Sequence, residues 1–365
     1  MRSIIKKSIL TLVIGSALLV GCKKDNPEPT PTPTPIPTPT PTYTVPTTYN
    51  FTNVSYSGQS IRLQMLDAIS TYMSQGGTGV VLDATQLKNM YSNTGNPFSN
   101  STLDASGKQL KSKTFAIDQT YFDNLFDDLA IASQSAGGVA SNGVAGVEGG
   151  RLFDGNGVEI AQVIKKQLMG AVFYYQAIET YLANLSIDDN VTVVSGEGTA
   201  QEHHADEAFG YFGAPVDFPT NTIDAKYWSE YCAEVSPAIT CNAPLMNAFL
   251  KLRAAISNKD NTTRDAQIVI VREQWERVVA ASAILEMIEG KAAFGTDNVE
   301  MRHVLSEAIG FINSLKYNGN KKISDTQIAS ALASLGTNFY TITLVQIDNA
   351  INIINGVYGF DLNAF

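Results

Sequence analysis

A nine-residue segment occurs twice in this chain, and the two copies contain all three of its histidines. Residues 203–211 (HHADEAFGY) match residues 303–311 (HVLSEAIGF), with His, Glu, Ala and Gly at the same offsets. A long stretch with an apolar stripe precedes each copy, residues 159–185 before the first and residues 262–289 before the second. A repeated pair of helices predicts two related helical bundles packed about an approximate two-fold axis.

Helical periodicity continues through most of the chain. Apolar residues recur on one face of a 3.6-residue period in residues 61–73 and 122–132. Further helices are expected at 159–185, 262–289, 299–316, 325–335 and 344–354, and four pairs fit the capping box: Thr199 with Glu202, Asp297 with Glu300, Ser324 with Gln327, and Thr343 with Gln346. The glycine-rich stretches 76–79 and 137–150 indicate loops, and only residues 190–194 suggest a short strand. We therefore expect an all-α domain over residues 49–365, with approximate halves 49–215 and 216–365.

The first 21 residues have the pattern of a lipoprotein signal peptide. A basic flank is followed by an apolar stretch at residues 9–20, which ends in Leu-Val-Gly before Cys22. The apolar run is short for a membrane span. This pattern predicts cleavage before Cys22, lipidation of Cys22, and anchoring of the protein in the outer membrane of a bacterial cell envelope. Whether the domain faces the periplasm or the cell surface stays open.

Residues 22–48 form a tether that is rich in Pro and Thr. Repeated Pro-Thr pairs favour extended polyproline II, and roughly 20 residues at about 3 Å each would span about 60 Å. An unstructured stalk is the alternative. Both interpretations place the first core residue at about Tyr49.

Two cysteines remain once Cys22 carries the lipid. In an oxidising envelope, Cys232 and Cys241 can close a small disulfide loop through Ser236 and Pro237, which would stabilise the domain by about 2–3 kcal/mol. The alternative is a pair of buried thiols. Both alternatives assign these residues to the scaffold.

The repeated His and Glu residues are the candidate metal ligands. Residues four apart share a helix face, which pairs His203 with Glu207 and His303 with Glu307; His204, three before Glu207, is a competing partner. If both helices meet, these side chains form a ligand set suited to iron, manganese or zinc. Alternatively, each pair is an internal hydrogen-bonding network that binds nothing.

The order of these motifs resembles the imelysin-like family of uncharacterised bacterial envelope lipoproteins. The resemblance covers residues 49–365 and rests on KQLMGA at 166–171, HHADEAFGYFG at 203–213 and LSEAIGF at 305–311. It implies a two-bundle helical protein of the periplasm or outer membrane, linked to iron acquisition and carrying a Gly-x-His-x-x-Glu motif. His204 and Glu207 match that motif, whereas Glu202 stands where the motif has Gly.

These patterns favour a non-catalytic envelope lipoprotein that binds a ligand, such as a metal ion or metal complex, in nutrient (iron) uptake together with an outer-membrane partner. The alternatives are a metal-dependent peptidase of imelysin type, for which the chain lacks His-Glu-x-x-His, and a structural or partner-docking protein. The net charge of −10 and the pI near 4.8 give no electrostatic reason to bind nucleic acid.

Overall fold

The computed structural model describes residues 42–365, and nearly all of their regular structure is helical. The α-helices are α1 (Ser57–Ser74), α2 (Ala84–Ser92), α3 (Ser101–Asp104), α4 (Gln119–Ser133), α5 (Ile160–Leu168), α6 (Ala200–Phe212), α7 (Trp228–Ile239), α8 (Asn242–Ser257), α9 (Asn261–Ala293), α10 (Asn298–Ser314), α11 (Asp325–Leu335) and α12 (Leu344–Tyr358). Two π-helical segments, η4 (Met169–Tyr174) and η5 (Gln176–Leu182), continue α5. The short 3₁₀ turns are η1 (Gln75–Thr78), η2 (Lys111–Lys113), η3 (Ala116–Asp118), η6 (Leu315–Tyr317) and η7 (Leu362–Ala364). The predicted all-α class is confirmed.

The signal peptide, Cys22 and most of the tether lie outside the described residues. Tyr49, where the core is expected to begin, is the first fully buried residue of the described part. Within residues 42–365, no helix is both long enough and apolar enough to cross a membrane.

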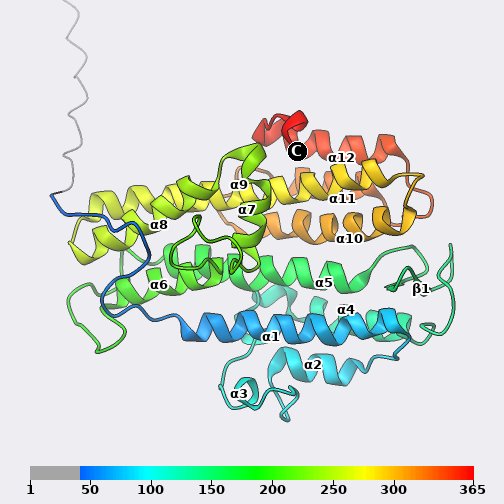
Figure 1. Cartoon of the computed structure of the whole chain (residues 1–365), viewed down its shortest axis with the longest axis horizontal. Helices are drawn as coiled ribbons and strands as arrows, with labels where there is room; N and C mark the ends of the chain where they lie inside the picture. The colour runs from blue at the N-terminus through cyan, green and yellow to red at the C-terminus, as the bar shows by residue number, and fades with distance from the viewer. Residues whose placement is uncertain (1–41) are drawn as a thin grey trace, which may run out of the picture. The chain divides into compact units, whose positions relative to one another are not determined.

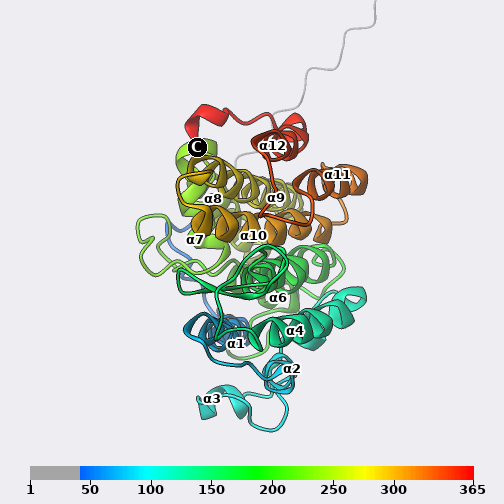
Figure 2. The same cartoon turned by 90° about the vertical axis from the view of Figure 1, so that its right-hand side faces the viewer.

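The helices of residues 43–365 run roughly side by side in stacked layers (Figure 1). The layers proceed from α2 and α3 through α1 and α4 to α5 and α6, then to α8, α9 and α10, and finally to α11 and α12, as the perpendicular view in Figure 2 also shows. The long helix formed by α5, η4 and η5 therefore lies in the middle of the stack.

The predicted capping residues mark the N-termini of helices in the structure. Thr199, Ser324 and Thr343 each form the complete capping box with the predicted partner three residues later. Asp297 caps α10 by accepting a hydrogen bond from the backbone N–H of Glu300. Such caps depend on only four consecutive residues, so the sequence alone specifies them.

Both copies of the repeat are helices, α6 and α10, and each packs on the long helix that precedes it in the chain. Helix α6 contacts η5, and α10 contacts α9. Helix α10 also packs against α5, which belongs to the first predicted half, so the halves 49–215 and 216–365 share an extensive interface. The middle layer is thus common to both repeats.

The repeated glycines permit close helix packing. A Cβ on Gly310 would lie 2.6 Å from the Cβ of Lys166 in α5, and a Cβ on Gly210 would lie 2.6 Å from the Cβ of Tyr56, the residue before α1. Real Cβ atoms do not approach one another so closely. Glycine at these positions allows α10 and α6 to pack against α5 and the start of α1.

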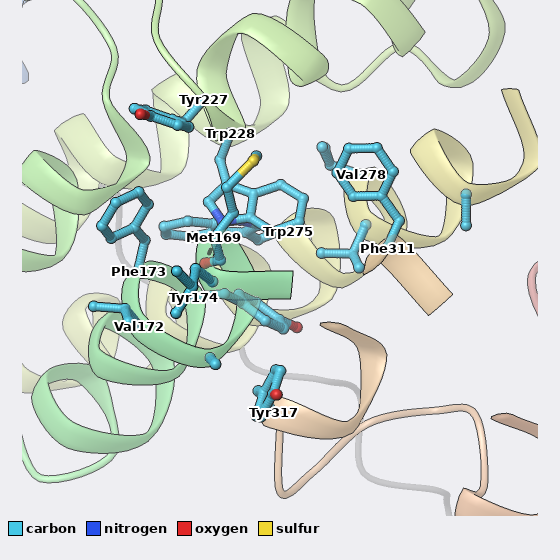
Figure 3. Packing of buried hydrophobic residues seen from close by; sticks show 14 of the residues in the cluster. Met169, Val172, Phe173, Tyr174, Tyr227, Trp228, Trp275, Val278, Phe311 and Tyr317 are labelled. Carbon is cyan, nitrogen blue, oxygen red and sulfur yellow. Dashed lines mark hydrogen bonds between the residues drawn. The ribbon is translucent and has the colours of Figure 1, made fainter. Parts of the chain in front are cut away.

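An aromatic cluster fills the centre of the core (Figure 3). Trp228 and Trp275 are fully buried, with ring centroids 6.5 Å apart, and Trp228 donates a hydrogen bond of 2.9 Å to the carbonyl of Met169. Tyr174 packs 5.5 Å from Trp275, and Phe311 packs 5.8 Å from Trp228. Residues from the π-helical segment, α7, α9 and α10 thus form a single core.

Two local predictions were wrong. Residues 190–194 form no strand, since only Val194 makes a single bridge to Gly198. The stretch 137–150 is not entirely loop, because it contains β1 (Gly146–Glu148), which pairs with β2 (Arg151–Phe153) in a tight hairpin. The segment between the two cysteines is largely helical: Cys232 lies in α7, and Pro237 falls in the last turn of that helix. The hairpin packs against η1, and a local sequence pattern does not report such tertiary contacts.

Candidate functional site

The second copy of the repeat forms a closed ionic network at the start of α10. His303 Nδ1 lies 2.7 Å from Glu159 Oε2, and His303 Nε2 lies 3.3 Å from Glu307 Oε1. Arg151 of β2 approaches the same Nδ1 at 2.5 Å and donates a 2.9 Å hydrogen bond to Glu300. Both ring nitrogens of His303 are therefore in contact with charged side chains of the protein itself.

Glu307 also has an internal cation as its partner. Lys166 Nζ lies 2.9 Å from Glu307 Oε2 and contacts the Tyr231 hydroxyl, and the Lys166 side chain is only 3% exposed. Burial acts to raise the pKa of Glu307, but Lys166 and His303 outweigh it and lower that pKa below its ordinary value. Burial, with the neighbouring Glu307 carboxylate, raises the pKa of Glu286 from 4.5 to about 10. At neutral pH the pair therefore consists of an ionised Glu307 and a protonated Glu286.

The first copy, in α6, is looser. His203 Nε2 lies 3.8 Å from Glu207 Oε1, and that oxygen accepts a 2.7 Å hydrogen bond from Gln59 of α1. His204 does not pair with Glu207 here: its Nδ1 lies 2.7 Å from Asp188. Of the two histidines, it is therefore His203, four residues before Glu207, that lies near this carboxylate. The other ring nitrogen of His203, Nδ1, is buried with no hydrogen-bond partner among the described residues.

The two His/Glu pairs are not brought together in one ligand set. Within residues 42–365, no group of three or more His, Cys, Asp or Glu side chains is arranged to hold a metal ion. The donors also fit a metal poorly, because Lys166 occupies one carboxylate oxygen of Glu307 and Arg151 lies against His303. A divalent cation would have to displace these cations.

A second buried network fixes the segment around Tyr49 to α6 and α8. Arg253 and Asp206 are both fully buried, and Arg253 Nε donates a 2.9 Å hydrogen bond to Asp206 Oδ1. Tyr49 donates to the same oxygen at 2.9 Å, and Arg253 Nη1 reaches Glu202 at 2.7 Å. Burial raises the pKa of Asp206 to about 6, although Arg253 acts to lower it. Sequence reasoning missed this network; its signal is an arginine within the apolar run of α8.

Cys232 and Cys241 lie side by side in the core. Both are thiols in the structure and both are fully buried, with sulfur atoms 3.1 Å apart. A disulfide bond has an S–S distance of about 2.05 Å, so its formation requires a small shift of the two sulfur atoms. The predicted disulfide stays a prediction, and the buried position is that of scaffold residues.

A cavity of about 680 Å³ lies apart from the repeated His/Glu pairs. The turn between α7 and α8, the middle of α9, the loop after η6 and the end of α12 form its walls. Its polar lining includes Thr240, Glu273, Gln274, Arg277, Asn320 and Lys322. Its volume lies within the range of about 300–1,000 Å³ that is typical of small-molecule sites. Sequence patterns did not indicate it, because its walls come from four separate segments.

The comparisons with known proteins give one match. A family model described as a domain of unknown function (DUF4856) matches residues 46–360. The chain belongs to this family. No curated protein and no solved structure matches the chain.

The DUF4856 match includes all the sites described above. Both His/Glu pairs, the Arg253 network, the two core cysteines and the cavity lie between residues 46 and 360. The predicted signal peptide and most of the tether precede the matched region.

Proposed function

We propose that this chain is a lipid-anchored protein of the bacterial cell envelope whose helical domain binds a small ligand and catalyses no reaction. The lipobox before Cys22 and the Pro/Thr-rich tether support the anchor. The start of the core at Tyr49, directly after the tether, supports a domain held away from the membrane. The lipid at Cys22 is then the contact with the membrane.

The cavity between α9 and α12 is the single observation that carries ligand binding. It combines a volume of about 680 Å³ with several polar side chains that converge from different segments. Pockets of this size with a few placed polar groups are the usual form of small-molecule sites. A binding role fits the cavity better than catalysis does, because the buried charged side chains Lys166 and Arg253 are already held in ion pairs with Glu307 and Asp206.

The resemblance to imelysin-like proteins extends this proposal to nutrient uptake at the outer membrane, with a membrane-embedded uptake protein as the partner. A metal ion has less support as the ligand than an organic molecule has. The metals considered are iron, manganese and zinc, and their candidate ligands are His203, His204, Glu207, His303 and Glu307. The donor set of His303 and Glu307 is already neutralised by Arg151 and Lys166. A metal-dependent peptidase requires the same ligands and has correspondingly little support. The net charge of −10 gives no basis for binding nucleic acid.

A thermal-shift screen of the full chain in detergent tests ligand binding. We expect at least one small molecule to raise the melting temperature of the wild type by about 2 °C or more, as binding at concentrations well above Kd requires. Asn320→Trp, which places an indole in the cavity from an exposed loop position, should abolish that shift and leave the melting temperature of the free protein unchanged.

Two further assays complete the test. A clickable palmitate analogue should label the wild type in cells and should not label Cys22→Ser. A casein digest should show no cleavage. Cleavage by the wild type that is lost in Glu307→Gln would instead support a peptidase function. Circular dichroism should first show that this variant is folded.

A further inference from the structure

Two cations line the cavity without a carboxylate partner, although the protein is acidic overall. Neither Arg277 nor Lys322 makes an ion pair or a side-chain hydrogen bond with any residue between 42 and 365. Other arginines of the same region are paired; Arg253 reaches two carboxylates and Arg272 reaches Glu179. Arg277 and Lys322, which have no acidic partner among the described residues, therefore lie at the wall of the cavity.

Both cations lie over one aromatic stack. The Arg277 guanidinium carbon is 4.9 Å from the centre of the Phe360 ring, and Lys322 Nζ is 5.8 Å from the centre of the Tyr358 ring. The two rings are stacked, with centroids 5.6 Å apart and planes 8° from parallel. Cation–π contacts hold both charges at one wall without neutralising them.

Glu276 fixes this wall and has its acceptors occupied. Its Oε1 accepts hydrogen bonds from the Tyr358 hydroxyl at 2.6 Å and from the Lys322 backbone N–H at 2.7 Å, and its Oε2 accepts one from Asn318 at 2.8 Å. The side chain is 4% exposed. Glu276 thus acts as a positioning residue that joins α9 to the loop and to α12.

The backbone is strained at another residue that lines the same cavity. Thr240, at the C-terminus of α7, has φ 54° and ψ 53°, the left-handed conformation that β-branched residues rarely adopt. Strain of this kind is concentrated at ligand-binding and catalytic sites. Thr240 lines the cavity and has no side-chain hydrogen bond to any described residue.

We propose that this cavity binds a small organic anion through a carboxylate or phosphate group held by Arg277 and Lys322. The inference rests on the proposed ligand-binding function and names the class of ligand. The guanidinium offers a planar fork of donors, and the ammonium adds a second point charge. Gln274, Asn320 and the Thr240 hydroxyl supply neutral donors around the rest of the ligand. Glu273, four residues before Arg277 on α9, opposes an anion and limits how much negative charge the cavity accepts.

Isothermal titration of the full chain in detergent tests this proposal, with citrate and pyrophosphate as anionic probes and spermidine and sorbitol as the cationic and neutral probes. We expect at least one anion to bind, more weakly at high salt, and spermidine and sorbitol not to bind. Arg277→Met and Lys322→Met should each weaken the anion by about tenfold or more, the loss expected for a charge-assisted hydrogen bond. Lys251→Met, which removes an exposed lysine of α8 outside the cavity lining, is the control and should leave affinity unchanged.

Glu273→Gln is the second test, and it should change anion affinity in the direction opposite to Arg277→Met and Lys322→Met. It should tighten anion binding, because it removes the opposing charge, and a purely structural role would not produce this gain. Anion binding that is equal in wild type, Arg277→Met and Lys322→Met would overturn the inference. Binding of spermidine or sorbitol alone, lost in Asn320→Trp, would overturn it and leave the ligand-binding function standing. If no probe binds and the thermal-shift screen also gives no hit, both the anion inference and the proposed ligand-binding function are overturned.

Discussion

Replacing Glu286 by glutamine should change how the stability of the domain depends on pH. Glu286 of α9 is 5% exposed, and its pKa is raised from 4.5 to about 10 by burial and by Glu307. The folded state therefore holds a proton that the unfolded state releases above about pH 4.5. The stabilising contribution of this proton is complete below about pH 4.5 and is lost progressively as the pH rises toward about 10.

The size of the effect follows from the linkage between protonation and folding. One proton changes the free energy of unfolding by about 1.4 kcal/mol per pH unit, hence by at most about 4 kcal/mol between about pH 5.5 and about pH 8.5. Glutamine can donate a hydrogen bond to Glu307 as the protonated acid does, and it does not titrate. The stability of Glu286→Gln relative to wild type should therefore increase with pH.

Urea unfolding at several pH values measures this difference. Trp228 and Trp275 are both fully buried, so their fluorescence reports loss of the core. Glu273→Gln, at an exposed position of the same helix, controls for the loss of one carboxylate. A stability difference between Glu286→Gln and wild type that stays constant across the pH range would refute the reasoning.

Three further predictions concern packing, the cysteines and metals. Gly310→Ala should lower stability by about 1–3 kcal/mol in a thermal melt, because its methyl group overlaps α5, whereas Gly356→Ala, with no atom within 4 Å, should leave stability unchanged or increase it. Protein from an oxidising compartment, unfolded without reductant, should resist alkylation at Cys232 and Cys241, and full alkylation of both would exclude the disulfide. Elemental analysis of the purified chain should find no stoichiometric iron, manganese or zinc; stoichiometric metal that is lost in Glu307→Ala would contradict the account of the ionic network.

Local features of the fold were predictable from the sequence. The capping boxes at Thr199, Ser324 and Thr343 each lie within four residues, and the structure has all three. The repeat predicted that α6 and α10 are helices of one kind, each packed on the helix before it. The glycine that the two copies share at the eighth position allows close packing, as Gly210 and Gly310 both show.

The partners of the repeated residues were not predictable in the same way. Arg151 reaches His303 from a hairpin 152 residues earlier in the chain, in a region whose glycines indicated a loop. Lys166 lies in an apolar stripe, and nothing in its immediate sequence shows that its ammonium group meets Glu307. The cavity depends on side chains from four segments, so it appears only when the helices are packed. Pairings over such separations are set by tertiary packing, which periodicity does not describe.

The central claim is that the cavity beside Arg277 and Lys322 is the ligand site. Hydrogen–deuterium exchange of the full chain, with and without the molecule that most raises its melting temperature, tests that claim most directly. We predict that protection is largest in the turn between α7 and α8 and in residues 318–322, the two non-helical segments of the cavity wall. Protection around His203 or His303, with no change at residues 318–322, would contradict the claim and return the search to the repeated histidines.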